Sequence, residues 1–328
     1  MIKLKKLPDS DFVILNLSDI QLDNDELLEG HLCRKIFDYT LNQLIDKVKP
    51  NLITLSGDLS WAGYDYAYET LANEMEKLGV PWAPVWGNHD NQLGAEYIDK
   101  IATSYLEKPH CVYEKGEREL GNGNYLILIE EEGRIVSAII MMDTHDKEEF
   151  ISSNGEKQES WAKLNDKQIK WYLEQVQFLK EQGCSDATIV LHIPIYAYNY
   201  ASIAAYKNPD KLKTMTVEES YSADSWNEGY KNSVGVQHED GVSSFCADDG
   251  VFDAIEKGGV TKRILAGHDH LNNFIIRYKG IDFAYSLKMG AGCYWESCLN
   301  GGTVITIGRN GENKIYHEYV DVSHLLSK

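Results

Sequence analysis

The stretch Trp-Gly-Asn-His-Asp at residues 86–90 decides how this chain folds, because it ends an apolar run at residues 80–85 that has the length of a buried strand. Glycine permits a sharp turn of the backbone there. Asn88 can bind a metal ion or donate a hydrogen bond to phosphate, His89 can carry a proton, and the Asp90 carboxylate can orient it. In a simpler interpretation, Asn88 or Asp90 only caps a helix that starts near Gln92. The stretch alone favours neither interpretation.

The first 90 residues alternate between apolar runs of strand length and segments with helical periodicity. Strands are predicted at residues 12–17, 52–55 and 80–85, and helices at residues 27–48 and 64–78 between them. This alternation is typical of βαβ units. Polar residues follow each strand, and ligands of open α/β sheets bind at the carboxyl ends of the strands. We therefore predict an α/β fold with a polar site at one sheet edge.

The second half of the chain is richer in predicted strands. Residues 125–129 and 135–141 flank a turn at 131–134 and predict a hairpin, which is followed by an amphipathic helix at 169–179 and a strand at 187–191. A strand is also predicted at residues 263–266, and short antiparallel strands at 274–278, 281–286, 303–307 and 314–320. No repeat or linker interrupts the pattern, so we expect residues 1–328 to form a single domain.

Residues 196–245 show weak periodicity and are rich in Tyr, Asn, Ser, Asp and Gly. Long irregular segments in compact domains are often functional loops or lids, and surface filler is the alternative. We predict an active-site loop insertion around residues 196–247. Within it, Tyr196, Tyr198 and Tyr200 either line the pocket and stack on a base or sugar, or serve for packing.

Composition restricts the partners and the compartment. The 328 residues are 43% hydrophobic and carry a formal net charge of −19 without a basic patch, which disfavours long nucleic acids. An anionic substrate would therefore need cations in its site. No segment reaches the ~18 apolar residues of a membrane span, and the charged N-terminus lacks the apolar region of a signal peptide. We expect a cytoplasmic protein with a small substrate, and neither a nucleic acid polymer nor a membrane as partner.

Cysteine usage agrees with that compartment. The six cysteines are scattered and contain no Cys-x-x-Cys pair, which favours reduced thiols over a disulfide framework or a zinc ribbon. A disulfide between Cys293 and Cys298 is the alternative.

The polar residues at the predicted strand ends form one candidate site, which comprises Asp19, Asp58, Asn88, His89, His192, His268 and His270. Each has a simpler explanation: the two aspartates can cap helices, and His192 can be a core histidine. Together, however, carboxylate, amide and imidazole groups are what two closely spaced metal ions require. Glycine precedes Asp58, Asn88 and His268, which permits close approach of the backbone.

These stretches together resemble the calcineurin-like metallophosphoesterase superfamily, and the later ones are most similar to its purple-acid-phosphatase-like phosphohydrolase branch. The matching stretches, in the family's order, are Ser18-Asp19-Ile20-Gln21, Gly57-Asp58, Gly87-Asn88-His89-Asp90, Leu191-His192-Ile193-Pro194 and Gly267-His268-Asp269-His270. The branch resemblance includes Leu271-Asn272 and Met289-Gly290-Ala291-Gly292-Cys293-Tyr294. The resemblance implies a four-layer α/β/β/α sandwich with two mixed β-sheets.

The resemblance also implies a role for each site residue. Asp58 would bridge two metal ions. The first ion would be held by Asp19 and His270, and the second by Asn88, His192 and His268. His89, held by Asp90, would stand over the leaving group as its proton donor or as a stabiliser of its charge.

One position departs from the family pattern. The family's first motif is Asp-x-His, whereas this chain has Asp19-Ile20-Gln21. An amide oxygen is a harder and weaker ligand than imidazole for late transition metals. We therefore expect a looser first site, shifted towards Mn²⁺ or Mg²⁺ or partly filled, unless Gln21 does not ligate at all.

The function implied is that of a dinuclear-metal-dependent phosphohydrolase. Two divalent or trivalent ions, chosen among Mn, Fe, Zn and Mg, would supply a hydroxide that attacks the phosphorus of a small phosphoester. A phosphodiesterase rather than a monoesterase is one alternative. A non-catalytic protein that binds metal or phosphate and is impaired at Gln21 is the other.

Overall fold

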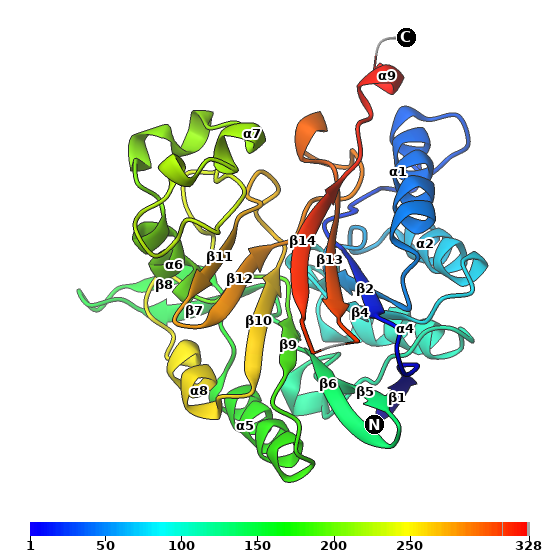
Figure 1. Cartoon of the computed structure of the whole chain (residues 1–328). Coiled ribbons are helices and arrows are strands. Elements are labelled where there is room, and N and C mark those ends of the chain that lie inside the picture. Colours follow the sequence, from blue (N-terminus) through cyan, green and yellow to red (C-terminus); the bar gives the residue numbers. More distant parts are fainter. Residues whose placement is uncertain (310, 327–328) are drawn as a thin grey trace.

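In the computed structural model, which describes residues 1–309 and 311–326, strands and helices account for much of the chain (Figure 1). The strands are β1 (Ile2–Lys5), β2 (Phe12–Leu17), β3 (Leu52–Ser56), β4 (Trp82–Val85), β5 (Tyr125–Glu131), β6 (Arg134–Met141), β7 (Lys147–Ile151), β8 (Lys157–Trp161), β9 (Ala187–Val190), β10 (Thr261–Ala266), β11 (Ile275–Tyr278), β12 (Ile281–Tyr285), β13 (Gly301–Ile307) and β14 (Lys314–Tyr319). The α-helices are α1 (Leu32–Val48), α2 (Asp65–Lys77), α3 (Asn88–Asn91), α4 (Ala95–Leu106), α5 (Asp166–Glu181), α6 (Ala197–Ala205), α7 (Val217–Ser220), α8 (Val251–Gly258) and α9 (Ser323–Leu326). Short 3-10 helices lie at η1 (Arg118–Leu120), η2 (Pro209–Thr214), η3 (Ala223–Ser225) and η4 (Ser297–Leu299).

The strands form two mixed sheets and a separate hairpin. The seven-stranded sheet has the order β1-β5-β6-β9-β10-β12-β11, and the five-stranded sheet has the order β14-β13-β2-β3-β4. Strands β6, β9, β10 and β12 are parallel to their neighbours in that run, and so are β2, β3 and β4. The carboxyl ends of each parallel set therefore lie at one edge of its sheet.

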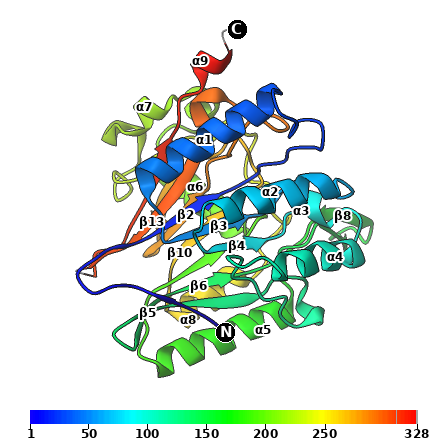
Figure 2. The same ribbon diagram turned by 90° about the vertical axis from the view of Figure 1, so that its right-hand side faces the viewer.

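Alternate residues of β5 show how the layers are stacked. Leu126 and Leu128 pack in one hydrophobic cluster with residues of α5, whereas Ile127 and Ile129 pack in the other cluster, with residues of the five-stranded sheet. Because side chains alternate across a strand, the seven-stranded sheet lies between α5 and the other sheet. Helices α1 and α2 cover the far side of the five-stranded sheet (Figure 2). The predicted four-layer α/β/β/α sandwich is confirmed.

Most of the predicted strands are present, but the first predicted helix starts too early. Residues 27–31 are not helical, and α1 begins at Leu32 with His31 as its cap. The reason is local: Oδ1 of Asp23 accepts hydrogen bonds from the N–H groups of Asp25 and Glu26 and holds a turn there. Side-chain caps of this kind compete with the helix.

Two sets of strands carry no clear sequence signal. β1 is a short strand paired with β5, and β7 and β8 form a hairpin that extends away from the sandwich (Figure 1). Residues of this hairpin are half-buried or exposed, so no apolar run marks them. The two predicted antiparallel pairs, β11–β12 and β13–β14, are confirmed. They belong to different sheets, and β12 is also parallel to β10.

The weakly periodic segment 196–247 is more ordered than its sequence pattern indicates. It contains α6, η2, α7 and η3. Tyr198 serves for packing: it is fully buried, and its hydroxyl lies 2.8 Å from the carbonyl oxygen of Ile264. Tyr196 and Tyr200 contact each other edge to face, and the hydroxyl of Tyr200 donates to Asp248.

Two further predictions concern cysteines and membrane spans. The six cysteines are free thiols, so the alternative disulfide between Cys293 and Cys298 is not formed. Within residues 1–309 and 311–326, no helix combines the length and the apolar character that crossing a membrane requires.

Candidate metal centre

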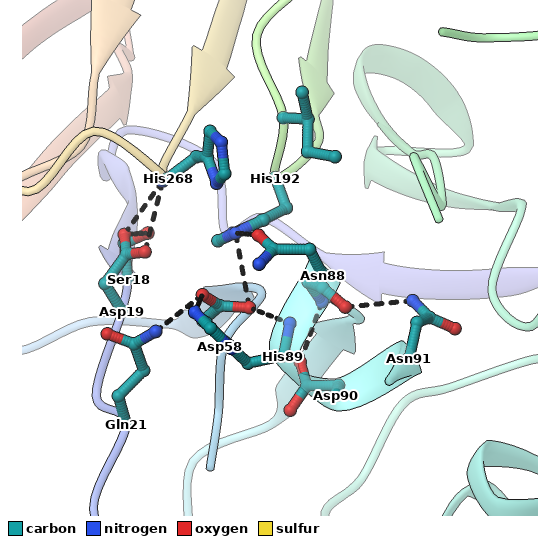
Figure 3. Close-up of polar contacts among 12 residues, drawn as sticks. Ser18, Asp19, Gln21, Asp58, Asn88, His89, Asp90, Asn91, His192 and His268 are labelled. Atoms are coloured by element: carbon teal, nitrogen blue, oxygen red, sulfur yellow. Dashed lines mark hydrogen bonds and ion pairs between the residues drawn. The ribbon is translucent and has the colours of Figure 1, made fainter. Parts of the chain in front are cut away.

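The carboxyl ends of five strands meet between the two sheets, and polar side chains converge there (Figure 3). Asp19, Asp58 and Asn88 follow β2, β3 and β4 of the five-stranded sheet, and His192 and His268 follow β9 and β10 of the seven-stranded sheet. The side chains of all five are at most 9% exposed. The fold thus brings together residues that are far apart in the sequence.

Two glycines make this convergence possible. A Cβ atom at Gly87 would lie 2.1 Å from Oδ1 of Asp58, and a Cβ at Gly267 would lie 2.1 Å from the hydroxyl of Ser18. Real atoms do not approach that closely, so any side chain at either position would push the candidate ligands apart. The predicted role of glycine before Asn88 and His268 is confirmed.

One group of side chains suits a metal ion between Asp19, Asp58 and His270. One ligand atom from each of these three buried residues lies within 4.8 Å of the others. Nδ1 of His270 donates to the carbonyl oxygen of Tyr294 at 2.8 Å, which directs Nε2 towards Oδ1 of Asp19 at 3.4 Å. Acceptors that face one another in a buried site need a cation between them.

A second group on the other side of Asp58 shows the same arrangement. Nδ1 of His192 donates to the carbonyl oxygen of Ser56 at 2.9 Å. Its Nε2 then faces Oδ1 of Asn88 at 3.0 Å and Oδ1 of Asp58 at 3.3 Å. The ring of His268 lies beside it, with 5.2 Å between the ring centroids. Amide oxygen, carboxylate and imidazole together fit a divalent ion.

The pKa shifts of the buried groups also indicate that this site requires positive charge. Burial alone would lower the pKa of His192, but the charge of Asp58 and the hydrogen bond to it raise that pKa to about 10. Burial and the nearby His192 lower the pKa of His268 to about 3. Burial opposes ionisation of Asp19, yet its hydrogen bond to His270 and the charge of His192 hold its pKa well below the usual range. Without metal, a proton on His192 balances these carboxylates.

Four of the residues in this centre have left-handed backbone conformations. Asp19, Gln21, Asp58 and His268 have φ values of 54°, 43°, 50° and 78°. Left-handed conformations cost non-glycine residues roughly 1–3 kcal/mol each and persist mainly at functional sites. The strain turns each side chain sharply out of its strand direction and towards the centre.

Gln21 lies in the centre, where its amide interacts with the shared carboxylate. Its side chain is buried, and Nε2 donates to Oδ2 of Asp58 at 2.7 Å. Its Oε1 is buried without a hydrogen-bond partner in the described part of the chain. An orphaned buried acceptor is costly unless a cation or donor meets it, so the position fits a residue that faces a metal ion.

His89 lies at the partly exposed side of the centre, and Asp90 does not hold it. The ring of His89 stacks near Trp61, with 4.1 Å between centroids, and its Nδ1 lies 2.8 Å from Nε2 of Gln92. Its Nε2 is 3.9 Å from Oδ2 of Asp58. Gln92 and Trp61 therefore orient the ring.

Asp90 instead fixes the loop that carries Asp58. It accepts hydrogen bonds from the N–H groups of Gly87 (2.7 Å) and Leu59 (3.1 Å) and from the hydroxyl of Tyr68 (2.6 Å). Burial and the nearby Asp58 raise the pKa of Asp90 to about 7. The prediction that Asp90 orients His89 is wrong, because the turn at Gly87 directs its carboxylate into the protein.

Several supporting residues escaped sequence analysis. Lys288 is buried and donates to the carbonyl oxygen of Asp19, and burial lowers its pKa to about 8. Trp161 of the β7–β8 hairpin contacts the ring of His268 edge to face, and Tyr294 stacks on His270. A lone lysine within the otherwise uncharged stretch 286–292 was the available signal for Lys288. No sequence signal indicated the roles of Trp161 and Tyr294.

This architecture and its paired ligand groups define a metal-dependent phosphoesterase. Residues 12–272 match the family described as calcineurin-like phosphoesterase. The match covers most of the chain and contains all the candidate ligands from Asp19 to His270. The chain belongs to this family of metal-dependent phosphoester hydrolases.

Relatives and a solved structure agree with that assignment. The chain is 24% identical to an Arabidopsis thaliana protein named "Probable inactive purple acid phosphatase 28", over 89% of this chain and 76% of that protein. It is 30% identical to a "Probable cyclic nucleotide phosphodiesterase" of Xenorhabdus bovienii, over 35% of this chain and 45% of that protein. A dimetal phosphatase from Danio rerio has a similar fold, with a TM-score of 0.54 at 13% identity, over 94% of this chain and 99% of that one.

Proposed function

We propose that this protein hydrolyses a small phosphoester with two metal ions that share Asp58. The observation that carries the proposal is the position of this carboxylate between two groups of acceptors. One contains Asp19 and His270, and the other contains Asn88 and His192. When bound, the ions would act as Lewis acids on the phosphoryl group and make a water molecule nucleophilic.

The protein residues prepare the site for this chemistry. Ser56 and Tyr294 accept the Nδ1 protons of His192 and His270, so both histidines present Nε2 as an unprotonated ligand when metal is bound. His89 stands at the partly exposed side of Asp58, where it can give a proton to the departing oxygen. Proton transfer of this kind is typically worth ~10²–10⁴ in rate.

Charge also favours metal-dependent binding of the substrate. The chain has a formal net charge of −19, which repels phosphate esters at a distance. Lys288 is buried against Asp19, so it does not offer a direct contact to substrate. Bound ions would therefore supply the positive charge that holds the phosphoryl oxygens. The free cysteines support a reducing compartment such as the cytoplasm.

Diester hydrolysis is the second candidate, because one relative is named as a cyclic nucleotide phosphodiesterase. A protein that binds metal or phosphate without turnover is the third candidate, because the Arabidopsis relative is named as inactive. The site of this chain argues against loss of activity, since His89 and both groups of acceptors are present together.

The decisive experiment combines metal analysis with a panel of phosphoesters. Bound metal is measured by mass spectrometry in the purified protein, and p-nitrophenyl phosphate and bis-p-nitrophenyl phosphate are assayed after chelation and reloading with Mn²⁺, Zn²⁺, Fe²⁺ or Mg²⁺. We expect two ions per chain and faster cleavage of the monoester. A faster diester reaction would favour the second candidate, and metal binding without turnover would favour the non-catalytic one.

A further inference from the structure

A pocket lies directly beside the candidate metal centre, on the side of His89. We call it the outer pocket; it has a volume of about 500 Å³ and is lined by Asp23, Glu26, Trp61, Ala62, Tyr64, Gln92 and Cys293. Neither the family assignment nor the proposed reaction gives it a role. Its volume is large enough for the organic part of a small phosphoester.

The lining residues connect the outer pocket to the reacting groups. Trp61 stacks near the ring of His89, and its Nε1 donates to the carbonyl oxygen of Gln21 at 3.1 Å. Gln92 contacts Nδ1 of His89 at 2.8 Å. A phosphoryl group on the metal ions would have His89 beside its leaving oxygen, so the group attached to that oxygen would extend into the outer pocket.

The lining of the outer pocket is acidic. It contains two carboxylates and no lysine, arginine or histidine. Within the described residues, Asp23 and Glu26 form no ion pair. Oδ1 of Asp23 accepts from the N–H groups of Asp25 and Glu26, and the Glu26 carboxylate accepts from the N–H of Asp23 at 3.4 Å and from the thiol of Cys33 at 3.7 Å. An anionic or strongly electron-rich leaving group would be repelled here.

Aromatic rings complete the lining. Trp61 is half-buried and Tyr64 is 39% exposed, so both offer ring surface to a ligand. Carboxylates combined with aromatic faces are the chemistry that recognises alkylammonium groups. A neutral sugar or base could stack on the rings, but it would make no use of the two carboxylates.

We propose that the outer pocket selects phosphoesters whose leaving group carries an ammonium ion, that is, phosphate esters of amino alcohols. Asp23 and Glu26 neutralise the ammonium group, and Trp61 and Tyr64 cover its alkyl substituents. The inference rests on the proposed phosphohydrolase function, because His89 and the metal ions define which end of the ester enters the pocket.

A matched pair of substrates tests this selectivity. Phosphocholine and 3,3-dimethylbutyl phosphate have the same shape, but only the first carries a positive charge. That charge also makes choline the better leaving group, so a binding comparison separates recognition of the charge from reactivity. With the metal-loaded protein, we expect kcat/KM for phosphocholine to exceed that for the neutral ester by about tenfold or more. Calorimetry under non-turnover conditions, with the metal-free protein and choline or 3,3-dimethylbutanol, should show the same preference without relying on activity.

Two isosteric variants and one control assign the effect to the pocket. Asp23→Asn keeps the hydrogen bonds that Oδ1 accepts, and Glu26→Gln keeps one of the two contacts of the Glu26 carboxylate. Both variants remove the charge, so each should reduce the preference, and the double variant should abolish it. Asp25→Asn removes the same charge from an exposed neighbour outside the pocket. That control should keep both the preference and the turnover of p-nitrophenyl phosphate.

Equal rates and equal binding for the charged and neutral compounds would overturn the ammonium proposal, even if p-nitrophenyl phosphate is hydrolysed. A preference that survives in the double variant would overturn it as well. Tighter binding of nucleoside monophosphates than of phosphocholine would assign the rings to base stacking instead. If no ester is cleaved but choline still binds selectively, the phosphohydrolase function fails and the ammonium site stands.

Discussion

The two sides of the metal centre differ in chemistry and in origin. The oxygen half comes from the five-stranded sheet and consists of Asp19, Gln21, Asp58 and Asn88. The imidazole half comes from the seven-stranded sheet and consists of His192, His268 and His270. Neither sheet alone carries a mixed ligand set, so the centre exists only where the two sheets pack together.

Each half is also held in place by the backbone of the other. His192, in the imidazole half, donates to the carbonyl oxygen of Ser56 at the end of β3. Asp19, in the oxygen half, accepts from the N–H of His268 at 3.1 Å. Outer contacts of this kind fix the direction of metal ligands. A bound ion would therefore strengthen the packing of the two sheets as well as the site.

The largest effect is expected where the two halves meet. Asp58→Asn should remove metal and activity together, with a loss greater than the roughly 100-fold that loss of an outer partner typically causes. Metal content by mass spectrometry and turnover of p-nitrophenyl phosphate measure this. Asp143→Asn is the matched control, because Asp143 is a buried carboxylate bound to the N–H groups of Asn122 and His145. Two bound metals and full rate in Asp58→Asn would refute the bridging role.

The next effect concerns His89, which we assign to neither half. His89→Asn should leave both ions bound but slow the cleavage of esters with poor leaving groups by about 10²–10⁴. Esters of p-nitrophenol need little protonation and should be affected least. Rates for a series of leaving groups of increasing pKa give the dependence. A uniform loss across the series would instead mean that His89 binds the ground state.

In the metal-free protein, the free energy of unfolding should depend on pH through two histidines of the imidazole half. The pKa of His192 is raised to about 10, so its stabilisation is complete below the unfolded pKa of 6.5 and is lost as pH rises towards 10. The pKa of His268 is lowered to about 3, so its neutral form stabilises the fold above pH 6.5, and this is lost as pH falls towards 3. The combined contribution of these two histidines is therefore largest near pH 6.5, with losses on the order of a few kcal/mol on either side. Asp90, whose pKa is raised to about 7, loses stability as pH rises from 3.8 to 7 and offsets the His268 effect there, so the alkaline loss from His192 is the limb to measure.

Denaturant unfolding across this pH range measures that profile, with the metal-loaded protein as its comparison. A metal ion on Nε2 takes the place of the His192 proton, so the loss between pH 6.5 and 10 should largely disappear after loading. His192→Gln should also flatten the alkaline limb of the metal-free protein. An unchanged alkaline limb in that variant would mean that another group titrates there.

The smallest effect is expected at Gln21, within the oxygen half. Gln21→His places an imidazole beside the first ion, and this should tighten the site and reduce the Mn²⁺ needed for half-maximal activity by a few fold. Metal titrations of chelator-treated wild type and variant compare the two. Overlapping curves would mean that Gln21 serves only as a hydrogen-bond donor to Asp58.

The candidate ligands could be predicted from the sequence, but the residues that hold them in position could not. Strand ends such as Asp19 and His192 stand out because apolar runs stop abruptly before them. The same pattern predicts the α/β class, whereas the four-layer arrangement was predicted from the family resemblance. The roles of Asp90 and Lys288 depend on where a turn directs one side chain, which periodicity does not encode. Trp161 lies on a solvent-exposed hairpin, whose strands bury too little surface to leave an apolar signal.

The order of the ligands along the chain has a consequence for protein synthesis. The hydrogen bond between His268 and Asp19 joins residues 249 positions apart. The amino-terminal ligands leave the ribosome long before β10 is made, so a nascent chain can offer incoming ions carboxylates but not the complete set. The full set of candidate ligands is thus complete only after β10 is made, and a prematurely terminated product that lacks β10 would lack His268 and His270.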